Sequence, residues 1–536
     1  MQKKRSLAKK YLPTGYLILA LVILLFATGC GDQSKHSWLK APINVIGTPS
    51  HRSILVEWDL VPEAQEYNIY WGTAAGVSPK KDESIRNVQS PYLLTGLTNG
   101  TPYFLIVTSV NASGESSPST EVAATPIVGP PLQNPMGVFS SQEILAGEQL
   151  GWSVSLVGNL AAIGAPGYTN ALATNAGAVY LFRRSTKTGL WAKSDIILPN
   201  DPLGNARFGE SVAISRGVLL VGAPGASAGS IPSAGAAYTF VENTDLTWSE
   251  SSKITITTPA TGDGFGTSLA MTSTLGAIAA PYRTVGGNLG AGEVFTFTIS
   301  GGVLSPLGSF VNPSSETQAQ FGSALAMDGL TMMISAPAAD TVLGGVTYLD
   351  AGKVFSYLFN ATSQVWNSTN IIESNLPGNN FLFGSSISVS GDIAAVGVQN
   401  ATVDNAGTAV VEAGRVEVLV RDAATGNWAW NVDLIEPVPT AHFHFGTTVG
   451  IVGNTIAVGS PFYSDADHNE RGGVYMHKRE PTTGIWAKGL LLNNIAPRAG
   501  EHMAWSLAIG VESLLLGAPD RSVSGQTSAG AFYAFE

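Results

Sequence analysis

The stretch FGESVAISRGVLLVGAP, residues 208–224, returns in nearly the same letters at residues 265–281 and 321–337. Looser copies begin at residues 150, 383, 445 and 503, so that seven copies follow one another at intervals of 56 to 62 residues. Self-similarity of this kind is typical of repeat architectures, in which one supersecondary unit recurs along the chain. The repeat therefore constrains the fold before any single motif is interpreted as a site.

Each copy contains four short runs that favour strands. FGxS opens an alternating apolar run, a tight turn leads to a second run ending in Gly-Ala-Pro or a variant, and a long loop precedes a third run such as AGAVYLF. The fourth run often carries a tryptophan, namely Trp191, Trp248, Trp366, Trp428 or Trp486. With 61 Gly, 29 Pro and only 12% charged residues, the composition suits many short strands and turns. Four antiparallel strands repeated seven times predict a seven-bladed β-propeller over residues 139–536, with a solenoid of stacked sheets as the alternative.

The two ends of the repeat region fit together. The last copy ends with AGAFYAFE, which corresponds to a third strand, and FSSQEILAGEQLGW, residues 139–152, aligns with the fourth-strand segments of the other copies. An N-terminal strand is therefore expected to complete the last blade. Closing the ring in this way would leave no open edge between the first and last blades.

The motifs resemble the FG-GAP repeat, the unit of the integrin α-chain propeller, over residues 139–536. In that family several repeats carry an Asp- and Asn-rich calcium loop between FG and GAP. Here the connection is a tight turn, such as Ser-Arg-Gly at 215–217 or Val-Gly-Asn at 157–159. A calcium ion takes about six to eight oxygen ligands, which these turns do not supply. We therefore expect no calcium in the head and assign no cofactor, with zinc as the alternative considered below.

Residues 41–126 form a separate unit, in which short apolar runs alternate with turn residues. Trp58, Tyr67, Tyr70, Leu97 and Tyr103 stand where a fibronectin type III domain has its core and its tyrosine corner, so the segment resembles that family. The family provides spacers as well as recognition modules, and the absence of an Arg-Gly-Asp tripeptide favours a spacer. Residues 127–138 are proline-rich and predict a semi-rigid linker.

The N-terminal residues predict export. Residues 1–29 carry five positive charges and an apolar run, and Ala27-Thr28-Gly29 before Cys30 resembles a bacterial lipoprotein signal peptide. Cys30 is the only cysteine in the chain, which favours its lipidation, with residues 30–40 as a tether. Gly31 after the cysteine favours, by the same resemblance, the outer membrane or cell surface. An uncleaved membrane anchor is the alternative. Removing residues 1–29 shifts the formal net charge from −11 to −16, which argues against nucleic acid as a partner.

Strand order divides the head into two faces. One face carries the loops that join the second strand to the third and the loops that join one copy to the next. These loops are long, and we call this face the loop face. The remaining turns share the opposite turn face. Long loops on a rigid scaffold are where binding usually resides, so the loop face is the expected ligand face. His442, His444, Asp465, Asp467 and His502 lie on it, and imidazole with carboxylate suits zinc. The alternative is that these residues are solvated loop tips.

These features predict a lipid-anchored envelope protein for binding or cell adhesion, with a protein or glycan ligand and a monomeric head. A hydrolase or lyase at the mouth of the propeller and a passive envelope scaffold remain alternatives. The one G-x-S-x-G match, GASAG at residues 225–229, lies in a long loop and not at a strand-to-helix turn, and no H-E-x-x-H motif occurs, so no catalytic residue is assigned and an enzyme is not favoured.

Overall fold

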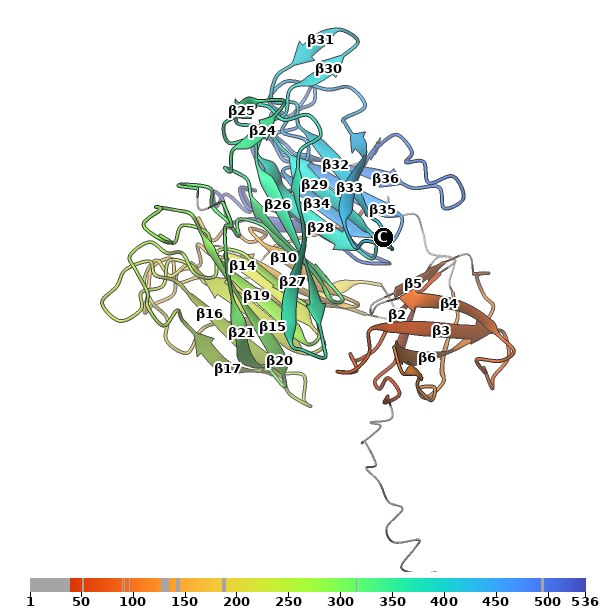
Figure 1. Cartoon of the computed structure of the whole chain (residues 1–536). Helices are drawn as coiled ribbons and strands as arrows, with labels where there is room; N and C mark the ends of the chain where they lie inside the picture. Colours follow the sequence, from red (N-terminus) through yellow and green to blue (C-terminus); the bar gives the residue numbers. More distant parts are fainter. Residues whose placement is uncertain are drawn as a thin grey trace, which may run out of the picture.

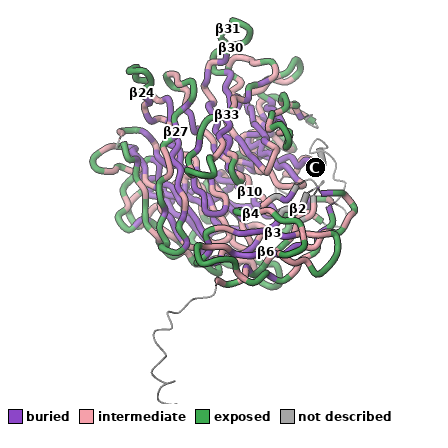
Figure 2. Tube along the Cα trace, turned by 45° about the vertical axis from the view of Figure 1, so that its right-hand side comes forward, coloured by how far each residue is buried: buried purple, intermediate pink, exposed green. Residues whose placement is uncertain are grey.

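The computed structural model describes residues 39–50, 53–88, 90, 92–95, 97–126, 135–140, 145–185, 189–314, 316–492 and 496–536. These residues form strands, turns and loops, and they contain no helix, hence none that could cross a membrane. The predicted signal segment and Cys30 lie outside the described residues, as do most of the predicted tether and residues 127–134 of the predicted linker. Figure 2 shows the buried strands in the interior and the exposed loops around them.

The N-terminal unit is a sandwich of two antiparallel sheets. One sheet contains β1 (Ile46–Ser50), β2 (Ser53–Glu57) and β5 (Tyr92–Thr95), and the other contains β3 (Glu66–Gly72), β4 (Glu83–Val88), β6 (Tyr103–Asn111), β7 (Gly114–Glu115) and β8 (Val122–Ala124). Trp58 is fully buried between them, with its ring centroid 5.2 Å from that of Tyr67. Thr98 N–H donates to the Tyr103 hydroxyl at 3.1 Å, as expected of a tyrosine corner.

The head, residues 135–536, contains seven four-stranded antiparallel sheets within its described residues. Sheet one has β10 (Val154–Val157), β11 (Leu160–Ala165), β12 (Ala178–Arg184) and β13 (Trp191–Ile197). Sheet two has β14 (Ser211–Ser215), β15 (Val218–Ala223), β16 (Ala236–Glu242) and β17 (Trp248–Ile254). Sheet three has β18 (Leu269–Met271), β19 (Leu275–Ala280), β20 (Glu293–Ser300) and β21 (Val303–Val311).

Sheets four and five each carry an additional hairpin in the loop after their second strand. Sheet four has β22 (Leu325–Asp328), β23 (Thr331–Ala336), β26 (Lys353–Asn360) and β27 (Val365–Glu373), with the hairpin β24 (Thr341–Leu343) and β25 (Val346–Tyr348). Sheet five has β28 (Phe383–Ser390), β29 (Ile393–Val398), β32 (Arg415–Arg421) and β33 (Trp428–Leu434), with the hairpin β30 (Val403–Asn405) and β31 (Thr408–Val410).

The last sheet combines strands from both ends of the head. Sheet six has β34 (Thr448–Val452), β35 (Thr455–Ser460), β36 (Gly473–Lys478) and β37 (Leu490–Leu491). Sheet seven has β38 (Ser506–Ile509), β39 (Leu514–Ala518), β40 (Ala531–Phe535) and, as its fourth strand, β9 (Pro135–Phe139). The completing strand starts earlier than the expected boundary at residue 139, within the predicted linker. The proline-rich composition of this segment indicated a linker. A strand can nevertheless begin at Pro135, because proline is tolerated at the first position of an edge strand.

Neighbouring sheets pack in a cycle of contacts. The first strand of each sheet contacts the first strand of the next, and β38 of sheet seven contacts β10 of sheet one. The hydrophobic clusters lie between sheets, as where Val179 and Leu181 of sheet one pack with Leu219 and Val221 of sheet two. Most of the repeated apolar residues therefore pack between neighbouring sheets.

Repeated glycines and hydroxyls form the seams between sheets. In five sheets a glycine near the end of the second strand faces a Ser or Thr hydroxyl, which donates at 2.7–2.8 Å to a backbone carbonyl of the next sheet. A Cβ on Gly164 would lie only 2.0 Å from the carbonyl oxygen of Gly209, so the close approach requires glycine. The donors are Ser153, Ser211, Ser386, Thr448 and Ser506, opposite Gly164, Gly222, Gly397, Gly459 and Gly517.

Sheets three and four have a different seam. Ala279 and Ser335 stand in place of the glycine there, and the described residues show no equivalent hydroxyl bond. The seam that joins sheet seven to sheet one is of the glycine type, because Ser506 Oγ donates to the carbonyl of Gly151 at 2.8 Å.

The fibronectin-type unit packs against the turn face. Arg216, in the turn between β14 and β15, forms an ion pair with Asp59, and Leu60 packs against a cluster of the head that includes Leu330. A cavity of about 430 Å³ between the two units is also lined by turns of sheets four and five. In Figure 1 the β24–β25 and β30–β31 hairpins lie at the opposite end of the head from this unit. The loop face is therefore left uncovered by it.

Candidate functional site

The residue that precedes each repeated FG has the same unusual backbone conformation. His444 has φ 52° and His502 has φ 51°, and the aligned residues Gln149, Arg207 and Gln320 have φ between 55° and 59°. A backbone hydrogen bond fixes the aromatic residue that comes next, as where Phe208 N–H donates to the carbonyl of Ala176 at 2.9 Å. Side chains on either side of FG thus take equivalent places on the loop face of successive sheets.

Several of these side chains join into a continuous arc. The Phe462 ring lies 5.2 Å from the His444 ring and 5.3 Å from the His502 ring, measured between centroids. The Trp505 ring lies 6.4 Å from that of His502 and 5.3 Å from that of Trp152. The guanidinium of Arg207 lies over the Trp152 ring at 5.1 Å. We call this set the aromatic arc, and all its members are partly exposed: His444, Phe462, His502, Trp505, Trp152 and Arg207.

Polar neighbours hold the two histidines of the arc in place. His502 Nδ1 lies 2.9 Å from Asp520 Oδ2, and its Nε2 lies 3.4 Å from Glu470 Oε2. The hydrogen bond to Asp520 outweighs desolvation and raises the pKa of His502. His444 Nδ1 lies 3.1 Å from Asn400 Oδ1. The arc therefore combines fixed aromatic surface with polar groups at its edge.

The five residues predicted for zinc are not gathered into one ligand set. His442 is 65% exposed at its side chain and pairs with Glu412 at 2.8 Å. His442 and His444 are two residues apart, and on an extended strand their side chains would point to the same side. The backbone is not extended here, because both residues have positive φ, 64° and 52°. Asp465 pairs with Arg471 at 2.5 Å. No group of three or more His, Cys, Asp or Glu side chains able to hold a metal occurs in the described part of the chain.

The structure thus brings only His444 and His502 of the predicted residues into the arc. Asp465 and Asp467 lie in the exposed loop after β35, where the carboxylate of Asp465 accepts the backbone N–H groups of Asp467 and His468. The arc residues Phe462, Trp505, Trp152 and Arg207 were not predicted. Their signal in the sequence is positional, because they flank the repeated FG or follow the repeated proline, where the other copies carry small or polar residues except at Tyr282 and Leu382.

Comparisons with known proteins identify both kinds of domain. A family model of the fibronectin type III domain matches residues 40–125, and a model of the FG-GAP repeat matches residues 140–182 and 191–240. The chain therefore contains a fibronectin type III domain and FG-GAP repeats. This combination suggests an extracellular protein of the binding or adhesion type.

Similarity to individual proteins is weak. No curated protein matches the chain. A fibronectin-like protein from Clostridium thermocellum is similar at 26% identity, over 16% of this chain and 88% of that chain, with a TM-score of 0.14. Sqt1 from Saccharomyces cerevisiae is similar at 9% identity, over 75% of this chain and 99% of that chain, with a TM-score of 0.40.

Proposed function

We propose that the protein is a lipid-anchored binding or adhesion protein of the cell envelope, which engages a protein or glycan through the aromatic arc. The arc is the observation that supports this function. Interfaces draw most of their binding energy from a few aromatic and arginine side chains held in a fixed arrangement, and the arc supplies Trp152, Trp505, Phe462 and Arg207 side by side.

We further propose that the head, from about residue 139 with β9 added, closes as a seven-bladed β-propeller. The cycle of contacts between first strands, the pairing of β9 with β40 and the bond from Ser506 to Gly151 support this closure. A closed ring holds the arc rigid, because sheets six, seven, one and two then stand in fixed succession around one mouth.

The proposed anchor and stalk precede the head in the chain. Lipidation of Cys30 would tether the chain to the outer membrane or cell surface, with residues 30–40 as tether. The fibronectin type III domain packs on the turn face through Asp59 and Leu60, so the loop face is free to meet a ligand. We propose a monomer, since one head carries the complete arc.

A matched pair of variants tests the arc. Tyr282, in sheet three, follows the repeated proline as Phe462 does in sheet six, and it is 51% exposed. Binding of the full chain to a panel of extracellular-matrix proteins, envelope proteins and polysaccharides is measured by surface plasmon resonance. Phe462→Ala should weaken binding by about 30-fold, the factor for a hot-spot side chain of about 2 kcal/mol, while Tyr282→Ala should change it less than about two-fold.

Two results would contradict the proposal. Equal losses in Phe462→Ala and Tyr282→Ala would show that the arc has no special part in binding. The absence of any ligand in the whole panel at micromolar protein concentration would argue against a binding or adhesion protein.

A further inference from the structure

His502, a member of the aromatic arc, lies between two carboxylates from different sheets. Its Nδ1 lies 2.9 Å from Asp520 Oδ2, in the loop after β39 of sheet seven. Its Nε2 lies 3.4 Å from Glu470 Oε2, in the loop before β36 of sheet six. The imidazole therefore faces one acceptor at each ring nitrogen. We call Glu470, His502 and Asp520 the histidine bridge, because their side chains connect sheets six and seven at the arc.

The protonation state of the imidazole decides how many of these two contacts are favourable. A neutral imidazole has one N–H, so it donates to one carboxylate and turns a lone pair toward the other. An imidazolium donates at both nitrogens and pairs with both negative charges. The geometry of the histidine bridge therefore suits the protonated form. The pKa of His502 is raised, chiefly by the hydrogen bond to Asp520, with burial opposing this and the contact with Glu470 adding to it.

The charges that act on His502 come from within the bridge. The charged residues next to its members in the sequence have partners of their own, namely Arg521 for Glu501 and Asp465 for Arg471. Asp520 and Glu470 are the carboxylates that lie within ion-pair distance of the His502 ring. They therefore set the direction in which its pKa moves.

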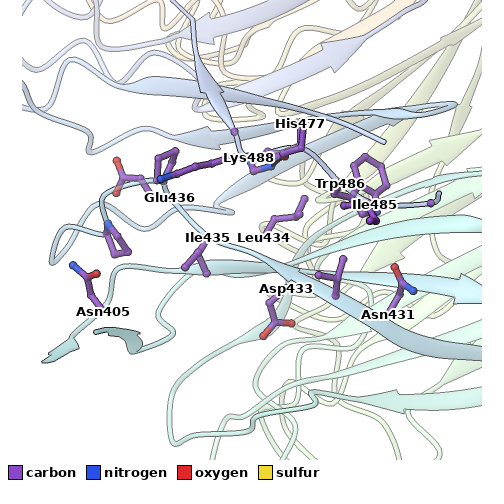
Figure 3. Close-up of a pocket in the computed structure, with 16 residues that line it drawn as sticks. Asn405, Asn431, Asp433, Leu434, Ile435, Glu436, His477, Ile485, Trp486 and Lys488 are labelled. Atoms are coloured by element: carbon purple, nitrogen blue, oxygen red, sulfur yellow. Dashed lines mark hydrogen bonds between the residues drawn. The ribbon is translucent and has the colours of Figure 1, made fainter. Parts of the chain in front are cut away.

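His477 shows what burial does to a histidine of this head that faces no carboxylate. It lies on β36 and is drawn in Figure 3 among the residues that line a cavity of about 520 Å³. Its Nδ1 lies 3.2 Å from the carbonyl of Ala487, and burial lowers its pKa to about 4. The opposite direction at His502 thus follows from the two carboxylates of the bridge.

The bridge bears directly on the aromatic surface of the arc. The His502 ring lies 5.3 Å from the Phe462 ring and 6.4 Å from the Trp505 ring, measured between centroids. Hydrogen bonds at both nitrogens fix the plane of the imidazole, whereas a bond at one nitrogen leaves the ring free to turn. Phe462 and Trp505 therefore pack against a fixed surface only when His502 is protonated. Surfaces that are fixed before binding lose less entropy on binding and so bind more tightly.

We propose that the histidine bridge makes ligand binding at the aromatic arc pH-dependent, strong while His502 is protonated and weaker once it is neutral. This inference rests on the proposed function, since it concerns the regulation of the same site. On deprotonation Nδ1 keeps its hydrogen and the shorter bond to Asp520, while the lone pair of Nε2 faces Glu470. The Glu470 side chain, which is 51% exposed, then turns to water and adds a free negative charge at the edge of the arc.

The backbone around the bridge does not titrate, so the change is local. His502 N–H donates to the carbonyl of Glu470 at 3.3 Å, and Met503 N–H donates to the carbonyl of Arg471 at 3.2 Å. These two bonds join sheets six and seven at any protonation state of His502. We therefore expect the fold to persist across the transition while the side chains of the arc lose their fixed arrangement.

A titration of the free full chain tests the bridge without any ligand. Histidine labelled with ¹³C in the ring is followed by NMR, and the signal of His502 is identified by its loss in His502→Asn, because asparagine tolerates the φ of 51° at this position. We expect a midpoint above the ordinary value of 6.5. Glu470→Gln should lower that midpoint, since an amide can donate to the neutral Nε2, which a merely structural role would not produce.

Two further measurements connect the bridge to the arc. The ¹⁹F signal of fluorotryptophan at position 505, identified by its loss in Trp505→Phe, should shift with the same midpoint as His502. His442→Asn is the matched control, because His442 pairs with Glu412 at 2.8 Å on the same face but lies outside the arc. It should leave the midpoint of His502 and the signal of Trp505 unchanged.

Binding is then compared in mildly acidic and mildly alkaline buffer with collagen, fibronectin and peptidoglycan as probes. The dissociation constant of the wild type should rise about five-fold in alkaline buffer, the factor for one hydrogen bond of about 1 kcal/mol. His502→Asn should bind equally in both buffers. If no probe binds in either buffer, that result counts against the proposed function, whereas the two NMR titrations still decide whether the bridge controls the arc.

Four results would overturn the inference. They are a His502 midpoint at or below 6.5, a midpoint that Glu470→Gln leaves in place, a Trp505 signal that does not follow His502, and a pH dependence of binding that persists in His502→Asn.

Discussion

Replacement of Gly517 by alanine tests whether the glycine seams hold the head together. A Cβ on Gly517 would lie 1.8 Å from the carbonyl oxygen of Gly151 and 2.3 Å from Ser506 Oγ. Both atoms must move away, which breaks the bond from Ser506 to Gly151 and overpacks the seam between sheets seven and one. The lost hydrogen bond costs about 1 kcal/mol and overpacking about 1–3 kcal/mol, so we expect a loss of about 2–4 kcal/mol.

Urea denaturation followed by tryptophan fluorescence measures this loss, since the rings of Trp152 and Trp505 pack at a tilt, with centroids 5.3 Å apart, across the same seam. Gly276→Ala is the control, because its Cβ would meet only the flexible end of Ile299 at 3.1 Å among nearby side chains. We expect the control to stay within about 1 kcal/mol of the wild type. Equal shifts in the two variants would refute the seam argument.

Three further predictions concern the completing strand β9, the buried His477 and the proposed anchor at Cys30. Deleting Pro135–Phe139 exposes the edge of β40 and removes the stacking of Phe139 on Phe532, whose ring centroids are 5.0 Å apart. The head should therefore aggregate or melt at a lower temperature. A monomeric variant with an unchanged melting temperature would contradict this. The pKa of His477 is about 4 when folded against 6.5 when unfolded, so the unfolded chain binds more protons and stability should fall from pH 6.5 to pH 4. His477→Asn should flatten that dependence in urea titrations at pH 5 and pH 7, and an unchanged slope would exclude His477 as its source. Cys30→Ser should abolish lipid labelling, and unchanged mass and labelling would rule out the proposed anchor.

The repeat predicted much of the fold because its residue types are required by packing contacts that recur from sheet to sheet. Glycines such as Gly164 and Gly209 stand where backbones meet, so the motif reports packing rather than chemistry. The start of β9 was missed, since Pro135 and its neighbours carry no alternating pattern. The hairpins β24–β25 and β30–β31 were treated as plain loops, although Gly344-Gly345, with φ 60° and 82°, is a good signal for a tight hairpin turn.

The candidate site was harder to predict because it depends on closure. Trp505 and Trp152 are far apart in the sequence and meet only where sheet seven packs on sheet one. The backbone conformation of His442 and His444 was also not predicted, since positive φ is uncommon for any residue other than glycine.

The pairing of β9 with β40 sets the order in which the head can form. Sheets one to six are each built from strands of one continuous stretch of chain, so they can assemble as soon as their own residues are available. Sheet seven must wait until residues 531–535 reach β9, which belongs to the first part of the head. Contacts between such distant segments carry the largest loop-closure entropy and form slowly. During synthesis the nearly finished head would therefore persist with exposed strand edges, and this is the stage at which a chaperone would protect it.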